Sequence, residues 1–212
     1  LHDRRQRQMC IRDRLWRELP RIDELPNGSQ LQSDGKLKFS DNFFEIFAIP
    51  QAWVVDLNGL NIRYRALQQE FHPDKYSTKS QIDQRLAVQM TSLINQAFET
   101  LKCPLKRAQY LLELSNIDTD QETHITTDGN FLMQQIELRE GLQDIFNHKE
   151  PWEMLERMRR EIEDIYLNLQ DSFQENYQKG SLGDALNITA KMQFFSKLLI
   201  EVENVEAELE DM

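Results

Sequence analysis

His72, Pro73 and Asp74 are the residues of this sequence whose types and spacing first suggest chemistry. An imidazole and a carboxylate two residues apart could hold a metal ion and activate water, as in a metal-dependent hydrolase. Such a site needs further ligands, and none stands at a suitable spacing. No serine or cysteine nucleophile is paired with the histidine in the sequence either. We therefore expect no catalytic residue, no metal ion and no cofactor.

The same tripeptide suits docking to another protein. Pro73 fixes the backbone and so reduces the entropy that is lost on binding. The carboxylate of Asp74 can meet an arginine in bidentate fashion, and the ring of His72 can donate or accept a hydrogen bond beside it. A small basic patch accompanies the tripeptide and suits an acidic partner surface, with an attraction that salt weakens. This basic patch consists of Arg63, Arg65, Lys75 and Lys79.

Two amphipathic helical patterns must position the tripeptide. Apolar residues recur at three- and four-residue steps before it, at Leu57, Leu60, Tyr64, Leu67 and Phe71, and after it, at Ile82, Leu86, Met90, Leu93, Ala97 and Leu101. Proline disfavours helical geometry in the preceding residue, so the first helix must end near Phe71 or His72. Asp56 and Ser80 are the predicted N-caps of the two helices. The sequence thus predicts a helical hairpin with His-Pro-Asp at its tip.

This hairpin resembles the J domain, the module that stimulates the ATPase of DnaK-class chaperones. Residues 42–50 look like its short first helix, residues 94–101 like the second half of its third, and residues 104–112 like its fourth, with Pro104 in the first turn. The helical region that follows, and above all residues 131–140, is similar to the HscB family, the J-type co-chaperones of iron–sulfur cluster biogenesis. The matching segments span about residues 42–210.

The J-domain resemblance implies a partner for the tripeptide. In that family the loop meets an HscA/DnaK-class ATPase where the nucleotide domain, linker and peptide domain of the chaperone join. The tripeptide and the basic patch would then form the chaperone-binding site. The family usually shows a denser basic helix before the loop, which Gln68, Gln69 and Glu70 dilute in this chain.

The helical pattern over residues 129–147 carries large apolar residues on two opposite faces. Phe131, Leu138, Leu142 and Ile145 form one face, which we predict to be core. The other face combines apolar residues with carboxylates, namely Leu132, Met133, Ile136, Glu137, Glu140 and Asp144, and Phe194 of a later helix could extend it. Exposed apolar positions edged by carboxylates indicate a protein-binding patch. The alternative is a helix buried on both sides, by the hairpin domain or by a second copy.

The HscB resemblance favours the patch. In that family this face binds the IscU-type scaffold on which iron–sulfur clusters are assembled, so the resemblance assigns scaffold binding to those seven residues. Ile136 and Asp144 stand where leucine and glutamate are common. Gly141 is unexpected in mid-helix and is predicted to weaken it by about 1 kcal/mol relative to alanine.

Composition favours an all-α fold, because the 212 residues include only seven glycines and six prolines and show no strand pattern. The predicted organisation is a J domain over residues 41–114, a connector over residues 115–128 and an antiparallel three-helix bundle over residues 129–212. The bundle helices are expected at residues 129–147, 151–178 and 182–210. Their predicted core rows are Leu155, Met158, Ile162, Ile165 and Leu169, and Ile188, Met192, Phe195, Leu199 and Val202.

Charge and cysteine content restrict the classes of partner and the cellular compartment that we expect. The net charge is −11, and after residue 116 there are 22 acidic but only eight basic residues, which disfavours nucleic acid as a partner. Two cysteines give no disulfide framework, and no apolar stretch has the length of a membrane span. A reducing compartment is therefore expected. The Cys-x-x-Cys segment that often precedes the J domain in eukaryotic relatives is absent, which favours a bacterial-type protein and hence the bacterial cytoplasm. Residues 1–40 are expected to be a disordered or non-native extension without function, since they are arginine-rich, lack apolar periodicity and begin with Leu1.

The sequence therefore predicts a non-enzymatic co-chaperone that activates a chaperone ATPase and delivers the cluster scaffold to it. Three alternatives stay open. They are a general J-domain co-chaperone that binds unfolded clients, a metal-dependent hydrolase that uses His72 and Asp74, and a structural helical adaptor with a fortuitous tripeptide.

Overall fold

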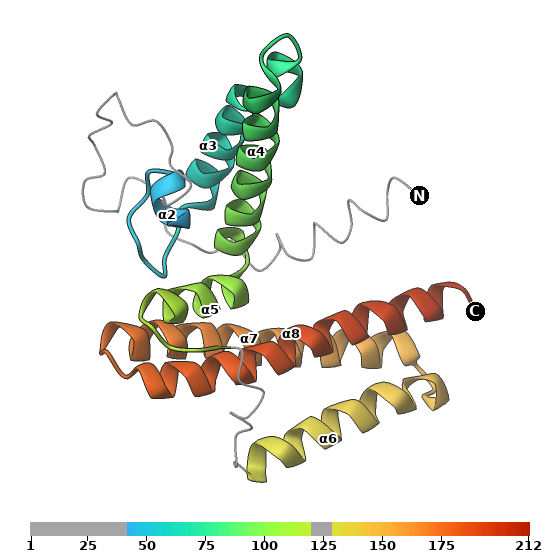
Figure 1. The fold of residues 1–212 in the computed structure, drawn as a ribbon. Coiled ribbons are helices and arrows are strands. Elements are labelled where there is room, and N and C mark those ends of the chain that lie inside the picture. The colour runs from blue at the N-terminus through green and yellow to red at the C-terminus, as the bar shows by residue number, and fades with distance from the viewer. Residues whose placement is uncertain (1–41, 120–128) are drawn as a thin grey trace. The chain divides into compact units, whose positions relative to one another are not determined.

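The computed structural model describes residues 42–119 and 129–212, and these residues form helices and turns without a strand (Figure 1). The all-α fold class is thereby confirmed. The helices are α2 (Phe43–Ile46), α3 (Leu57–Glu70), η2 (Pro73–Tyr76), α4 (Gln81–Lys102), α5 (Pro104–Leu114), α6 (Gly129–Asp144), η3 (Ile145–Asn147), α7 (Pro151–Gln178) and α8 (Leu182–Glu210). The expectations for residues 1–40 and for most of the connector, residues 120–128, lie outside the described residues.

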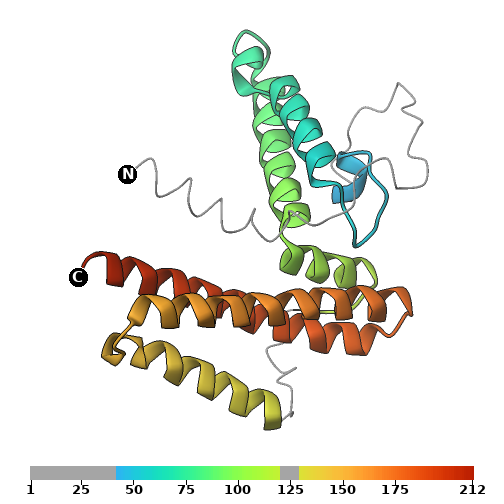
Figure 2. The ribbon, with the colours of Figure 1, turned by 180° about the vertical axis from the view of Figure 1, so that it is seen from behind.

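Helices α3 and α4 form the predicted hairpin and lie side by side in both views (Figures 1 and 2). The Asp56 side chain accepts hydrogen bonds from the first turn of α3, and the Ser80 hydroxyl accepts one from the Asp83 N–H of α4, so both predicted N-caps are confirmed. Helix α3 ends at Glu70, as the following proline requires. Between the helices the rings of Tyr64 and Phe98 stack with centroids 4.0 Å apart.

One part of the predicted hairpin core is wrong. Ile82 and Leu86 belong to the predicted apolar row of the second hairpin helix, but their side chains are 77% and 46% exposed. Helix α3 has 14 residues and α4 has 22, so the first turns of α4 extend beyond the end of α3. These turns lie beside the short η2 segment, which has no buried residue to cover them. Periodicity identified the face only in part, because Ala87 and Ile94 are buried instead of the predicted Leu86 and Leu93, and it gave no information about how far the partner helix reaches.

Helix α2 packs at the base of the hairpin. Asn42 and Glu45 form a capping box that starts the helix. The ring of Phe43 stacks on Tyr110 of α5 at 4.4 Å, and the Phe43 N–H donates to the Tyr110 hydroxyl at 2.9 Å. Burial raises the pKa of Tyr110 above its ordinary value, so the phenol is neutral at physiological pH.

Arg107 of α5 is a buried cation that the sequence analysis missed. Its side chain is 3% exposed and donates to the carbonyl oxygens of Leu101 and Trp53, both at 2.7 Å. Desolvation lowers the pKa of Arg107 to about 10, so the group stays charged at neutral pH. The signal was available, because Arg107 stands at a core position of α5 between the buried Pro104 and Ala108.

The hairpin region and the bundle are in direct contact. Helix α5 packs against α8. The Trp53 ring, which lies under the Arg107 guanidinium at 5.3 Å, also lies 4.6 Å from the ring of Phe173 of α7. One tryptophan therefore contacts both the buried cation of the hairpin region and the core of the bundle.

Helices α7 and α8 form a long antiparallel pair that supplies most of the bundle core (Figures 1 and 2). The predicted bounds, 151–178 and 182–210, are confirmed. The predicted core rows are right in part, because the buried residues continue as Tyr166 and Phe173 whereas Ile165 and Leu169 are half-buried. A straight helix has 3.6 residues per turn and drifts away from a heptad row of period 3.5.

Helix α6 lies along this pair and presents its predicted core face to it. Phe131, Leu138, Leu142 and Ile145 are all buried, which confirms that prediction. A Cβ atom at Gly141 would lie 3.0 Å from the Met158 methyl of α7, the flexible end of that side chain, so α6 and α7 approach closely here. None of the helices that the structure describes is long and apolar enough to cross a lipid bilayer.

Candidate functional site

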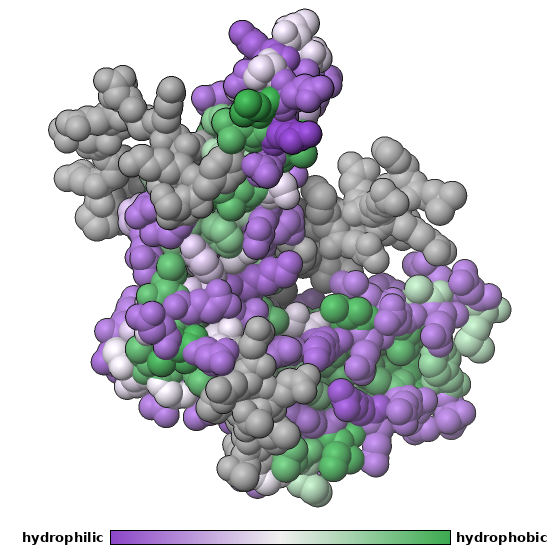
Figure 3. Space-filling view, in the orientation of Figure 1, coloured by the Kyte–Doolittle hydropathy of each residue, from purple (hydrophilic) through white to green (hydrophobic). Residues whose placement is uncertain are grey.

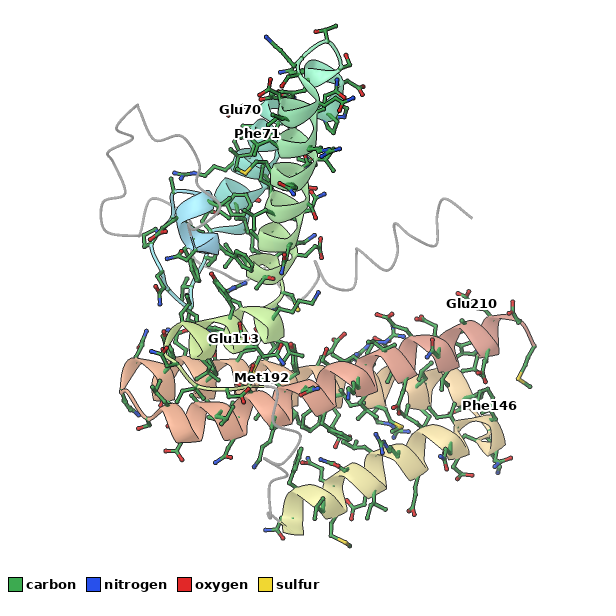
Figure 4. All side chains as sticks on the ribbon, in the orientation of Figure 1. Glu70, Phe71, Glu113, Phe146, Met192 and Glu210 are labelled. Carbon is green, nitrogen blue, oxygen red and sulfur yellow. The ribbon has the colours of Figure 1, made fainter. Side chains whose placement is uncertain are left out.

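The His-Pro-Asp turn is exposed at the tip of the hairpin, directly after Glu70 and Phe71 (Figure 4). His72 caps the short η2 segment, and its Nδ1 atom accepts the Asp74 N–H at 3.3 Å. The Asp74 carboxylate is 91% exposed, and one of its oxygens lies 3.6 Å from the His72 Nδ1 atom, on a ring that is itself 53% exposed. The carboxylate is thus positioned by the turn and remains accessible to a partner's arginine.

Hydrogen bonds from α4 hold the turn in place. The Gln84 side-chain amide donates to the carbonyl oxygens of Ser77 and Lys79, at 3.0 and 3.2 Å. The Thr91 hydroxyl donates to the carbonyl of Phe71, at 2.9 Å, on the other side of the turn. A turn that is ordered before binding loses less entropy when a partner docks.

Three of the four predicted basic-patch residues are exposed, namely Arg65 on α3 and, after the tripeptide, Lys75 and Lys79. Arg63 is placed differently, because its guanidinium donates to the carbonyl oxygens of Phe47 and Ala48 at the end of α2. Ala48 has a left-handed backbone, with φ of 49°, and the two hydrogen bonds help to hold that turn. The structure therefore gives Arg63 a structural contact that the sequence did not indicate. A shallow hollow of about 380 Å³ also lies beside His72, lined by Gln68, Gln69 and Lys75.

The predicted scaffold-binding face of α6 is exposed. Leu132, Met133 and Ile136 are 42%, 59% and 52% exposed, so neither the hairpin region nor α7 and α8 covers them. The carboxylates that edge them are exposed as well, at Glu137, Glu140 and Asp144. Figure 3 shows apolar surface over the first half of α6 within a largely hydrophilic surround. We refer to these six residues as the α6 stripe.

Phe194 of α8 lies next to α6, as the sequence suggested. Its half-buried ring meets the ring of Phe131 edge-on, with centroids 5.7 Å apart, and the ring of Phe195 at 5.2 Å. Phe131 directly precedes Leu132, so tertiary packing brings Phe194 to the margin of the stripe. On another side of α6 an open groove of about 500 Å³ begins at Met133 and Glu137 and reaches Ile165 of α7.

No metal centre accompanies these surfaces among residues 42–119 and 129–212, where no three histidine, cysteine or carboxylate side chains are grouped to hold an ion. The His72 and Asp74 pair therefore has no third ligand from the described chain. Both surfaces are exposed and suit docking to a partner.

A His-Pro-Asp turn on a helical hairpin, followed by a helical bundle, defines a J-type co-chaperone. The family of the HSCB C-terminal oligomerisation domain matches residues 127–203. A curated "Co-chaperone protein HscB homolog" from Shewanella woodyi is 35% identical over 168 residues, covering 78% of this chain and 97% of that protein. The relative of the same name from Photobacterium profundum is 34% identical over 165 residues, covering 78% and 96%.

Solved structures agree with the sequence relatives. Chaperone HscB from Vibrio cholerae is 36% identical and superposes with a TM-score of 0.74, over 80% of this chain and 99% of that one. Human co-chaperone protein HscB shares the fold, with a TM-score of 0.73 at 24% identity, over 80% of this chain and 84% of the human one. The chain belongs to the HscB family of co-chaperones.

Proposed function

We propose that this protein activates an HscA/DnaK-class chaperone ATPase and delivers an IscU-type iron–sulfur scaffold protein to it. Residues 41–114 act as the J domain, and residues 129–212 form the bundle that binds the scaffold. Residues 115–128 connect these two domains. The delivery promotes cluster transfer and the maturation of iron–sulfur proteins in the bacterial cytoplasm. The protein itself carries out no covalent chemistry.

The observation that supports this proposal is the presence of two exposed, chemically different surfaces on separate helical units. The hairpin tip presents a carboxylate on a turn that α4 already holds in place. The α6 stripe presents three large apolar side chains edged by carboxylates. A narrow face of this kind suits one specific partner better than a range of unfolded chains, which flexible or methionine-rich surfaces bind.

Activation of the ATPase requires that the turn bind the hydrolysis-competent state of the chaperone more tightly than the resting state. Each tenfold increase in rate corresponds to about 1.4 kcal/mol of that difference. A preorganised turn with an accessible carboxylate can supply part of this difference in binding free energy through a bidentate ion pair to an arginine.

Steady-state ATP hydrolysis by an HscA-type chaperone tests the proposal. The rate is measured for the chaperone alone, with this protein, with the scaffold protein, and with both. Stimulation by this protein that rises further with the scaffold, beyond the sum of the separate effects, is the expected result. Stimulation that is indifferent to the scaffold would instead identify a general J-domain co-chaperone. No stimulation by the folded protein would contradict both functions.

A further inference from the structure

The ring of Phe194 is held on three sides. Phe131 of α6 and Phe195 of α8 contact it edge-on, as described above. On a third side the guanidinium of Arg139 lies 5.4 Å from the ring centroid, within the range of a cation–π interaction. Arg139 is the one basic residue of α6 and stands in the middle of a helix whose other charges are carboxylates.

Arg139 has a second contact on α8. Its Nη2 atom lies 3.9 Å from a carboxylate oxygen of Glu201, and both side chains are about half exposed. Glu201 follows Phe194 by seven residues, so the two occupy the same face of α8, two turns apart. A single side chain of α6 therefore contacts two points along the face of α8 that is turned toward α6.

These contacts do little for the stability of the fold. Exposed ion pairs contribute little free energy of unfolding, and a cation–π contact at an exposed site is similarly weak. The position of these contacts, between α6 and α8, matters more for the inference than their energy. Helix α6 packs on α7 and α8 less extensively than these two pack on each other, so its exact position depends on few contacts. Arg139 supplies one of these contacts at the boundary between the α6 stripe and Phe194.

We infer that Arg139 is a positioning residue of the scaffold-binding surface. It holds the Phe194 ring against α6 and fixes α6 relative to α8, so that Phe194 and the α6 stripe present one continuous face. The inference rests on the proposed function and adds to it a residue that acts through Phe194. Side chains locked before binding lose less entropy in the complex, which is how a contact outside the interface centre affects affinity.

The test is a double-mutant cycle in the full chain, with the dissociation constant for an IscU-type scaffold protein as the readout. Arg139→Gln is expected to raise Kd about fivefold, the equivalent of a weak cation–π contact. Arg139→Lys should raise it less, because an ammonium group can still lie over the ring. In a Phe194→Ala background, Arg139→Gln should have almost no further effect, because the ring through which it acts is gone.

Two controls make the result decisive. Arg160→Gln on α7 removes an exposed arginine whose ion pair to Glu156 lies within the same helix, and should leave Kd unchanged. Thermal melts of each variant show whether a change in Kd reflects unfolding. If Arg139→Gln leaves Kd unchanged, or costs the same with and without Phe194, the inference is overturned.

A reference variant, Leu132→Ala with Glu137→Ala, distinguishes failure of the positioning role from failure of the proposed function. If this variant weakens scaffold binding while the Arg139 cycle shows no coupling, the proposed function survives and the positioning role fails. If the reference variant binds the scaffold as tightly as the unaltered protein, the scaffold-binding face itself is wrong and the inference falls with it.

Discussion

Asp74 is the residue on which chaperone activation should depend most. Its carboxylate is almost fully exposed, and the backbone of the turn is held by other residues. Asp74→Asn keeps the shape of the side chain but removes the charge that an arginine would meet in bidentate fashion. We expect it to abolish ATPase stimulation and to leave the affinity for the scaffold unchanged, as measured by steady-state hydrolysis and by titration with the scaffold protein.

Asp164→Asn is the matched control for this experiment, because Asp164 is an exposed carboxylate on α7 and should be neutral in both assays. Parallel loss of stimulation and scaffold binding in Asp74→Asn would contradict the assignment of the two activities to separate surfaces.

The α6 stripe gives the second prediction at this scale. Leu132→Ala combined with Glu137→Ala removes an apolar anchor and one of its flanking carboxylates, and we expect scaffold binding to weaken by about 2–4 kcal/mol. Both side chains are exposed, so the melting temperature should change little. Leu167→Ala with Glu161→Ala, an exposed pair on α7, serves as the control. A large fall in melting temperature for the stripe variant would place these residues in a core.

At the scale of the elements, Arg107 joins α5 to the end of α4 and to the segment before α3. Arg107→Met keeps much of the buried volume but leaves the Leu101 and Trp53 carbonyl oxygens without their donor. We expect the free energy of unfolding to fall by about 2–4 kcal/mol, measured by urea denaturation. Lys106→Met, at an exposed position of the same helix, should cost far less. Equal effects of the two substitutions would show that the buried hydrogen bonds do not matter.

A pH effect is expected where α7 and α8 meet around Arg159. Burial raises the pKa of Glu203 above its ordinary value; nearby Glu206 adds to the rise, and Arg159 opposes it. The folded state then binds this proton more readily than the unfolded state, so the group lowers stability above its folded pKa, and the penalty disappears as pH falls toward about 4.5. Glu203→Gln should raise the melting temperature slightly at pH 7.5, and the difference should vanish near pH 4.5. A difference that grows on acidification would contradict this.

At the scale of the whole molecule, the proposed function needs both surfaces on one chain. Delivery raises the local concentration of scaffold near the chaperone only if the J domain and the bundle are linked. A mixture of Asp74→Asn with the Leu132→Ala and Glu137→Ala variant should therefore fail to restore the synergy between this protein and the scaffold in ATP hydrolysis. Recovery to the level of the unaltered protein would show that the two surfaces act independently.

The two surfaces differ in how far the sequence predicted them. The hairpin tip was predictable because proline, N-caps and apolar periodicity act locally, and Asp56, Ser80 and the end of α3 are where these rules place them. The exposure of the α6 stripe followed from its position opposite a four-residue core face. The contacts of Arg63 and Arg107 were less predictable, because their hydrogen bonds to Phe47, Ala48 and Trp53 span 15 to 54 residues. The position of Arg107 on the buried face of α5 was nevertheless visible in the sequence.

The sequence by itself determined the helices, their bounds and the chemistry displayed on each helix face, since these depend on interactions within a few residues of one another. The tertiary structure decided which of those faces meet. It left Ile82 exposed because α3 is too short to cover it, and it buried Arg107 with its guanidinium over the Trp53 ring. It also placed Arg139 over Phe194, 55 positions further along the chain. Such contacts depend on the relative length and packing of separate helices, which no local pattern encodes.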